Sequence, residues 1–342
     1  MVDILRRRPK EKTLQQSNIT GPSLVGQICD LIGTTNNTIY VHPKGTWLGA
    51  THTPDAMRDP SLRYRQPTVF GPAPGPRQDA HGHAFTSTLK QSTISKTTIK
   101  FKTSASVLRN LFPNSNYSFD NHSEIAQASF SIESLRNLAW LGWQGYDLLA
   151  LYLHDVIYTD SHGRQRRGTY VPVMIENLAD PIITGREELG VPKLFSDIDI
   201  SRTDTSVKVS VSWRGAQWAT LEVEGLKAEQ PATPAERDSN GSESEGLLVH
   251  KYIPSTGGDG AQPDADYDVL ILNVPNASAV KSISVAEPAG VSVQIHNLGS
   301  QKLPTLHTVV DGLARIPVLE IVEASVTELQ GVSDLSNVER LS

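Results

Sequence analysis

A succession of strand-like segments, joined by short connections, most limits the folds open to this chain. Apolar and polar residues alternate in TIKFKTS (98–104), SVKVSVSW (206–213) and WATLEVEGL (218–226), as in strands with one buried face. Several connections are too short for the crossover that a parallel pair needs, so neighbouring strands should be antiparallel. Since helical patterns such as SASVLRNLF (104–112) are few and short, the sequence predicts an α+β fold built on a large, curved, mostly antiparallel β-sheet. We expect that sheet to close into a barrel or cone around a ligand cavity.

Two long segments in the middle of the chain predict a β-hairpin. YDLLALYLHDVIY (146–158) and TYVPVMIEN (169–177) flank the turn-forming TDSHGRQRRG. Further strands are predicted at DVLILNV (268–274), VSVQIHN (291–297) and IPVLEIVEASV (316–326).

The first part of the chain has a different composition. Residues 1–85 are rich in Pro, Gly, Thr and Asn and show little periodicity, so we expect an N-terminal extension that wraps the domain or is partly disordered. The first 20 or so residues offer little apolar surface, and we expect them to be dispensable. The strand-rich domain is predicted over 86–330 and a C-terminal tail over 331–342.

Composition excludes several classes of protein. Of the 342 residues 38% are hydrophobic and 20% charged, which is typical of a soluble globular protein, and the net charge of -6 leaves no electrostatic footprint for nucleic acid. The single cysteine, Cys29, excludes an internal disulfide, and no segment has the apolar length of a membrane span or the pattern of an export signal. The sequence therefore predicts a cytoplasmic protein with no membrane or nucleic-acid partner.

Familiar motifs for cofactors and metals are missing from the sequence. It contains no P-loop, no dinucleotide fingerprint and no G-x-S-x-G elbow. The HGH triplet at 81–83 could bind a metal, but no third ligand lies near it in the sequence. We therefore predict no metal site and no cofactor.

One lysine stands directly after a proline inside a short apolar stretch, GREELGVPKLF (185–195). A lysine acts as a nucleophile through its neutral amine, and burial among apolar groups favours that form. Leu189, Val191 and Leu194 supply apolar neighbours for Lys193, while Pro192 restricts the backbone. Lysines in general are more often structural or exposed, so the local stretch leaves both readings open.

The wider window ENLADPIITGREELGVPKL, with GTYVPVMI before it, resembles the acetoacetate decarboxylase family. In that family an extended strand leads into a Gly-Arg-Glu segment and then into a Pro-Lys that carries the catalytic amine. The resemblance runs from about residue 97 to 330, and the matching residues are Gly185, Arg186, Glu187, Pro192 and Lys193. It implies a catalytic Lys193 and a substrate pocket formed by Arg186, Glu187, Leu148, Pro192 and Leu194.

The chemistry that the resemblance implies is decarboxylation of a β-keto acid through a Schiff base. The neutral amine of Lys193 would attack the ketone and lose water, and the iminium would be the electron sink when CO2 departs. No metal or organic cofactor takes part. The family is oligomeric, so we also expect a homo-oligomer, at least a dimer.

The sequence departs from the family's decarboxylases around the lysine. Leu194 stands where they have a second lysine, and Leu148 stands where they carry a glutamate. Their arginine near the start of the domain has no match, Lys90 and Lys96 being the nearest cations. These changes make the pocket more apolar and favour a larger substrate, as in divergent, fungal-type members associated with secondary metabolism.

Two other functions therefore stay open. The first is an aldolase, dehydratase or cyclase acting on a polyketide-like carbonyl compound. The second is a noncatalytic small-molecule binding protein in which Lys193 only pairs with a ligand carboxylate. Burial of the amine would favour the enzymes over the binding protein.

Overall fold

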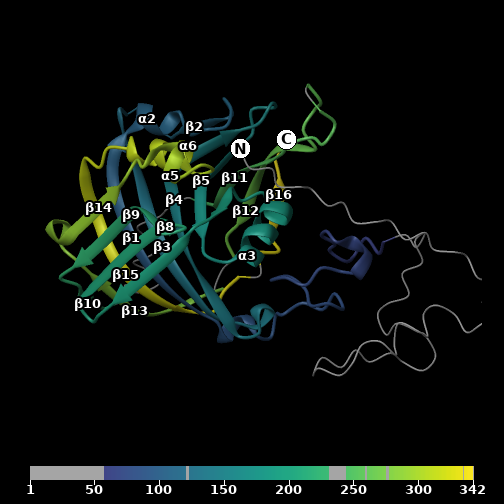
Figure 1. Cartoon of the computed structure of the whole chain (residues 1–342), viewed down its shortest axis with the longest axis horizontal. Coiled ribbons are helices and arrows are strands. Elements are labelled where there is room, and N and C mark those ends of the chain that lie inside the picture. The colour runs from purple at the N-terminus through teal and green to yellow at the C-terminus, as the bar shows by residue number, and fades with distance from the viewer. Residues whose placement is uncertain are drawn as a thin grey trace, which may run out of the picture. The chain divides into compact units, whose positions relative to one another are not determined.

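The computed structural model describes residues 58–120, 123–230, 244–258, 260–274, 277–333 and 335–341. These residues belong to one compact unit, in which two β-sheets and a few short helices are packed together (Figure 1). The expectation that the first 20 residues are dispensable falls outside the described residues, as does Cys29.

The larger sheet has twelve strands and is mostly antiparallel. Among the described strands, the parallel pairs are β5 with β6 and β5 with β11. In hydrogen-bonded order the main path is β10 (Lys227–Glu229), β13 (Ala279–Val285), β15 (Glu320–Gln330), β1 (Thr93–Ser104), β3 (Ile125–Leu138), β4 (Gln144–Thr159), β5 (Gln165–Glu176), β11 (Gly246–Ile253), β12 (Ala265–Leu272) and β16 (Val338–Arg340). Two short strands lie off this path, β2 (Tyr117–Phe119) on β4 and β6 (Lys193–Phe195) on β5.

The predicted class, a large and mostly antiparallel sheet with few helices, is confirmed. The predicted hairpin is β4 and β5, paired antiparallel. Among the described strands the path is open, because β10 and β16 form no pair with each other. Closure of the sheet into a barrel or cone therefore stays a prediction.

The smaller sheet consists of β14 (Val291–Ile295), β9 (Ala216–Glu224), β8 (Ser206–Trp213) and β7 (Asp197–Arg202) in that order. Alternate residues of β8, such as Val207 and Val209, are buried and share one apolar core with Ile99 and Ile132 of the larger sheet. The strand pattern predicted for this region thus places its apolar side chains between the two sheets.

The helices are short. They are α2 (Ala105–Arg109), α3 (Ala179–Thr184), α5 (Gly299–Lys302) and α6 (His307–Ala314), with single turns η1 (Thr68–Phe70), η2 (Leu89–Gln91), η3 (Ala139–Leu141), η4 (Gly185–Leu189) and η5 (Pro288–Gly290). Within the described part of the chain, no helix has both the length and the apolar character needed to cross a bilayer.

The middle strands of the larger sheet are buried on both faces. On β4, Leu149 and Leu151 belong to the main core, whereas Leu148, Ala150 and Tyr152 belong to a second apolar cluster on the opposite face. Alternate side chains of one strand thereby line two separate interiors. The candidate site lies on the face of the second cluster.

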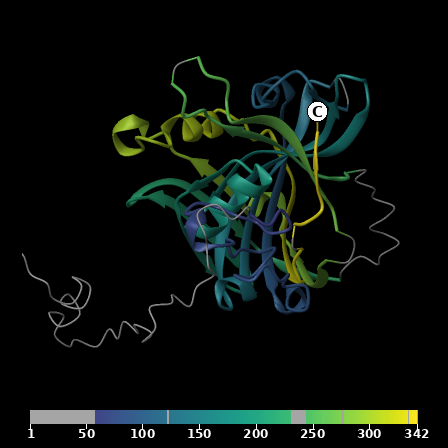
Figure 2. The ribbon, with the colours of Figure 1, turned by 90° about the vertical axis from the view of Figure 1, so that its right-hand side faces the viewer.

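The segment before β1 packs beside α3, on the side that faces the viewer in Figure 2. Residues 58–85 of the predicted extension therefore belong to the compact unit that contains the sheets. At the other end of the chain, β16 pairs with β12, so part of the predicted tail continues the larger sheet. The predicted domain boundaries at 85 and 330 stay predictions.

Candidate active site

Strand β6 brings the amine of Lys193 to the middle of the larger sheet. It pairs parallel with the end of β5, with Lys193 opposite Met174 and Phe195 opposite Glu176. Met174 and Glu176 are two residues apart on β5 and therefore point to the same face, where the side chain of Lys193 joins them. Lys193 is 7% exposed. The fold therefore buries this lysine, although most lysines in proteins are exposed.

The turn before β6 shapes the space around this side chain. Gly190 adopts φ of 79°, a left-handed conformation that favours glycine, and the Val191 amide donates to the carbonyl of Gly185 at 3.1 Å. A Cβ on Gly185 would lie 2.4 Å from Cε and 2.7 Å from Nζ of Lys193. Gly185 is therefore the residue that makes room for the lysine, because any side chain at this position would occupy the space of the amine.

The amine of Lys193 has two polar contacts. Nζ lies 2.7 Å from Oε1 of Glu176 and donates to the carbonyl oxygen of Pro181 in α3 at 3.1 Å. Glu176 is fully buried, and neither of its carboxylate oxygens has a hydrogen-bond partner among the described residues, so the contact of Oε1 with Lys193 is an ion pair. Burial raises the pKa of the Glu176 carboxyl, an effect that the neighbouring Lys193 opposes. Both members of this ion pair are thus poorly solvated.

Lys193 opens into a cavity of about 490 Å³. Its walls combine a majority of apolar side chains with two carboxylates and two tyrosines; they include Ile94, Glu133, Leu135, Tyr146, Leu148, Tyr152, Met174, Glu176, Leu189, Val191, Leu247 and Ile271. A smaller cavity of about 70 Å³ shares Lys193, Tyr146 and Leu189 with it. Lys193 therefore borders both spaces.

Three strands contribute one row of residues across the wall of the larger cavity. Leu148 of β4 is opposite Glu133 of β3 on one side and opposite Glu176 of β5 on the other. Glu133 has its own cation, since Lys96 Nζ lies 3.3 Å from its Oε1, and it also accepts from Ser131 Oγ at 3.0 Å. The two carboxylates are thus separated by an apolar side chain and are paired with different lysines.

Two tyrosines add polar groups to this wall. Burial, reinforced by the nearby carboxylates Glu133 and Glu176, raises the pKa values of Tyr146 and Tyr152 well above the usual value for a phenol. Both therefore keep their protons at neutral pH and can act as hydrogen-bond donors to a ligand oxygen.

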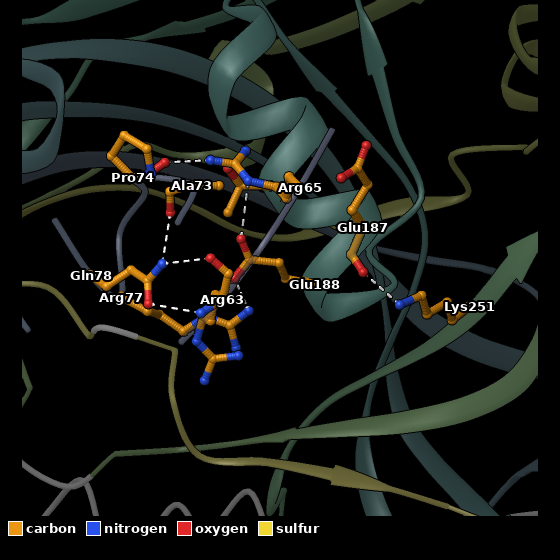
Figure 3. A network of polar contacts seen from close by, with 10 residues as sticks. Arg63, Arg65, Ala73, Pro74, Arg77, Gln78, Glu187, Glu188 and Lys251 are labelled. Carbon is orange, nitrogen blue, oxygen red and sulfur yellow. Dashed lines mark hydrogen bonds and ion pairs between the residues drawn. The ribbon is translucent and has the colours of Figure 1, made fainter. Parts of the chain in front are cut away.

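The N-terminal segment is attached to the turn that carries Gly185 (Figure 3). Arg77 Nε donates to Glu188 Oε2 at 3.0 Å, and Arg65 Nε lies 3.3 Å from Glu188 Oε1. Arg65 also donates to Thr184 Oγ1 at 2.7 Å. The two arginines and the carboxylate are all at most 13% exposed. These buried contacts hold the segment against α3 and η4.

The same segment encloses the smaller cavity. Gln78 stabilises its loop by donating to the carbonyls of Arg63 and Ala73 at 2.8 and 2.9 Å (Figure 3). Further along, Pro76, Phe85 and Leu89 line the smaller cavity beside Lys193. Pro76 and Phe85, which belong to the predicted extension of residues 1–85, therefore form part of the candidate site together with Leu89 of the predicted domain.

The structure brings together only some of the predicted site residues. Lys193 and Leu148 line the larger cavity, but the other four do not. Arg186 is exposed and donates to the backbone carbonyl of Lys193 at 3.0 Å. Glu187 is also exposed, and its backbone carbonyl accepts a hydrogen bond from Lys251 Nζ at 2.5 Å (Figure 3).

The two neighbours of the lysine in sequence also lie outside this cavity. Pro192 accepts from the Met174 amide at 3.1 Å, and Leu194 packs against the main core because it points to the opposite face from Lys193. None of Arg186, Glu187, Pro192 and Leu194 lines the larger cavity, and of the four it is Arg186 that contacts the backbone of Lys193. Their role in a substrate pocket stays a prediction.

Sequence reasoning did not identify Glu133 and Glu176. A signal was available for Glu176, which directly follows the apolar run VPVMI, whereas Glu133 lies in the mixed segment FSIESL. A charge at such a position has to be paired or exposed. Its partner could not be read from the sequence, because strand register decides it.

Comparisons with known proteins identify the family of this chain. A family model described as acetoacetate decarboxylase (ADC) matches residues 97–337. The chain belongs to the acetoacetate decarboxylase family. The resemblance noted in the sequence is thereby confirmed, and membership supports an enzyme. No curated protein matches the chain.

Several solved structures share the fold of this chain at low sequence identity. An acetoacetate decarboxylase has a TM-score of 0.52 and 15% identity over 73% of this chain and 89% of its own. An acetoacetate decarboxylase-like enzyme from Sphingomonas wittichii RW1 has a TM-score of 0.51 and 13% identity, over 73% of this chain and 92% of its own. The enduracididine biosynthesis enzyme MppR, complexed with pyruvate, has a TM-score of 0.50 and 16% identity over 73% and 89%.

Proposed function

We propose that this chain is a cofactor-independent lyase in which Lys193 forms a Schiff base with a carbonyl substrate. The observation that carries the proposal is the position of the amine: it is buried, it faces a largely apolar cavity of about 490 Å³, and a carboxylate lies 2.7 Å away. A site that excludes water stabilises the neutral amine and protects an iminium from hydrolysis. An exposed lysine would have neither property.

Decarboxylation of a β-keto acid is the leading reaction. The amine of Lys193 adds to the ketone, water leaves, and the iminium accepts the electron pair of the carbon–carboxylate bond as CO2 departs. Protonation of the resulting enamine and hydrolysis then release the ketone and the lysine. Membership of the acetoacetate decarboxylase family supports this reaction.

Carbon–carbon bond formation, dehydration or cyclisation of a polyketide-like carbonyl compound is the second candidate. A specific observation favours it: the described lining of the larger cavity has two carboxylates, Glu133 and Glu176, and no cation other than Lys193. A β-keto acid would bring a third carboxylate into the cavity without a cation to pair with it, and burying an unpaired charge costs free energy. MppR, a biosynthesis enzyme in complex with pyruvate, supports a carbonyl compound as ligand without requiring the acetoacetate reaction.

A noncatalytic binding protein is the third possibility, and chemical trapping separates it from the enzymes. Sodium borohydride added with 2,4-pentanedione or acetone should leave a reduced adduct on Lys193, located by peptide mass spectrometry. Lys193→Arg should give no adduct, because a guanidinium stays protonated and cannot attack. Absence of an adduct from the wild-type protein would contradict the proposal.

Release of CO2 separates the two enzymatic candidates. Acetoacetate offered to a protein that forms the adduct should yield CO2 and acetone if decarboxylation is the reaction. An adduct without CO2 release from acetoacetate or longer β-keto acids would favour the second candidate.

Cytoplasmic location and a homo-oligomer complete the proposal. Neither enters the chemistry described above. Sedimentation velocity at micromolar concentration should show at least a dimer, and a monomer would contradict that part of the proposal.

A further inference from the structure

We propose that Glu176 is the group that removes the proton from Lys193 and later returns it to the leaving hydroxyl. This inference rests on the proposed function, because it names the acid and base for Schiff-base formation. In this proposal Glu176 takes part in the reaction. In a purely structural role it would only balance the charge of Lys193.

The geometry limits the groups that can take this proton. Within the described part of the chain, the recorded polar contacts of Lys193 Nζ are the Glu176 carboxylate at 2.7 Å and the Pro181 carbonyl at 3.1 Å. A backbone carbonyl accepts a hydrogen bond but is far too weak a base to hold the proton. The carboxylate is therefore the base within reach of the amine.

The surroundings favour transfer of the proton within the pair. Glu176 is fully buried, and Lys193 nearly so. Removing charges from water costs free energy. Loss of solvation therefore makes an ion pair less stable relative to a pair of neutral groups. Neither carboxylate oxygen of Glu176 has a hydrogen-bond partner among the described residues, so the ion pair with Lys193 is the interaction that stabilises its charge. Burial thus lowers the cost of forming the neutral amine beside a neutral acid.

The steps balance without any outside reagent. The ammonium of Lys193 gives one proton to the Glu176 carboxylate, and the neutral amine adds to the substrate carbonyl. A proton moves from nitrogen to oxygen to give the carbinolamine. The Glu176 acid then protonates the departing hydroxyl, which leaves as water, and the carboxylate again faces a cation, now the iminium. The sum is an ammonium plus a ketone giving an iminium plus water.

The other carboxylate of the cavity provides a matched control. Glu133 lies on the far side of Leu148 in the same cross-strand row and is paired with Lys96. It shares the cavity with Glu176 but has no recorded contact with Lys193. A general effect of negative charge in the cavity would therefore appear in variants of both residues, whereas a proton-transfer role belongs to Glu176 alone.

The test is the pH dependence of adduct formation with 2,4-pentanedione, followed by the ultraviolet absorbance of the enaminone on Lys193. In the wild-type protein the proton moves within the pair, so the rate should change little over the neutral range. In Glu176→Gln the proton must leave to solvent, so the rate should fall by roughly 10²-fold or more and then rise about tenfold for each pH unit. Glu133→Gln alters the same cavity wall and can change the size of the rate, but its pH profile should stay flat because Glu176 still takes the proton.

Each outcome decides one question. Wild-type protein without an adduct contradicts the proposed function itself. An adduct in both the wild type and Glu176→Gln, at similar rates and with equally flat profiles, contradicts only the role of Glu176. If Glu176→Gln does not fold, Glu176→Asp replaces it: a slower reaction with a flat profile supports the role, and a tenfold rise per pH unit contradicts it.

Discussion

Gly185 and Lys193 lie so close together that a single methyl group on the glycine would overlap the lysine side chain. The missing Cβ would be 2.5 Å from Cδ and 2.4 Å from Cε. Gly185 itself has φ of -65° and ψ of -40°, which any residue can adopt. The requirement for glycine at this position therefore comes from the lysine and not from the backbone.

Gly185→Ala should move the amine without unfolding the protein. We expect the rate of adduct formation at Lys193 to fall at least about tenfold, a change of roughly 1.4 kcal/mol in the barrier. Gly312→Ala in α6 is the matched control, because a Cβ there meets nothing within 4 Å and alanine favours a helix by up to about 1 kcal/mol. Equal adduct rates in Gly185→Ala and the wild type would show that the amine does not need this space.

Lys193→Met should destabilise the protein, because it leaves the buried carboxylate of Glu176 without a cation. Removing one partner of a buried ion pair typically costs about 3 to 5 kcal/mol. The double variant Lys193→Met/Glu176→Leu removes both groups and should recover most of the loss. Urea unfolding at pH 8 measures the free energy of unfolding of the wild type, the single variant and the double variant. A single variant as stable as the double variant would indicate that the carboxyl is already neutral.

The loss in Lys193→Met should depend on pH in a defined direction. Burial raises the pKa of the folded Glu176 carboxyl above its usual value of 4.5, so the folded state binds its proton more tightly than the unfolded state. Its contribution to stability is therefore fully present below about pH 4.5 and is lost as pH rises through the folded pKa. The difference between Lys193→Met and the double variant should grow from pH 5 to pH 8. A constant difference would contradict this assignment.

His154 should make the protein sensitive to acid. Burial, with a smaller effect of Lys100 and Lys96, lowers the pKa of His154 to about 4, and its Nε2 lies 2.9 Å from Ser129 Oγ. The stability that the neutral imidazole contributes is present above its ordinary pKa of 6.5 and is lost as pH falls towards about 4.

Thermal unfolding from pH 7 to pH 4 checks the effect of His154. His154→Gln should lose less stability than the wild type over this range. His162→Gln, in the exposed turn between β4 and β5, should behave as the wild type does. Identical acid sensitivity of the wild type and His154→Gln would exclude the imidazole as a cause.

Arg77→Met should release the N-terminal segment from η4. It removes a buried partner of Glu188, which keeps only Arg65 at 3.3 Å, so we expect a loss of about 3 kcal/mol. Trypsin should then cut between residues 58 and 92 more readily than in the wild type. Arg164→Met, which removes an ion pair whose arginine is 75% exposed, should cost less than about 1 kcal/mol. Unchanged proteolysis in Arg77→Met would show that other contacts hold the segment.

Alternation of apolar and polar residues predicted β1, β8, β9 and strands of the central hairpin, because period-two burial leaves a local signal in the sequence. Apolar segments also predicted β12, β14 and β15, whereas β2, β6, β7, β10, β13 and β16 were not predicted. The family resemblance is also carried by a short continuous segment, GREELGVPKL. That segment indicated both the fold and the catalytic role proposed for Lys193. The apolar run of β11 was not predicted, since its eight residues, GLLVHKYI, follow neither a clean alternation nor a helical period.

Tertiary structure alone decided what surrounds the lysine. Glu133, Leu148 and Glu176 are spread over 44 positions in the sequence and form one row only because β3, β4 and β5 pair in a particular register. Arg77 and Glu188, 111 positions apart, meet because the N-terminal segment packs on the turn before β6. A local pattern records which side of a strand is buried. Which buried groups face each other depends on strand register and on packing between distant segments, and these are set by the free energy of the whole fold.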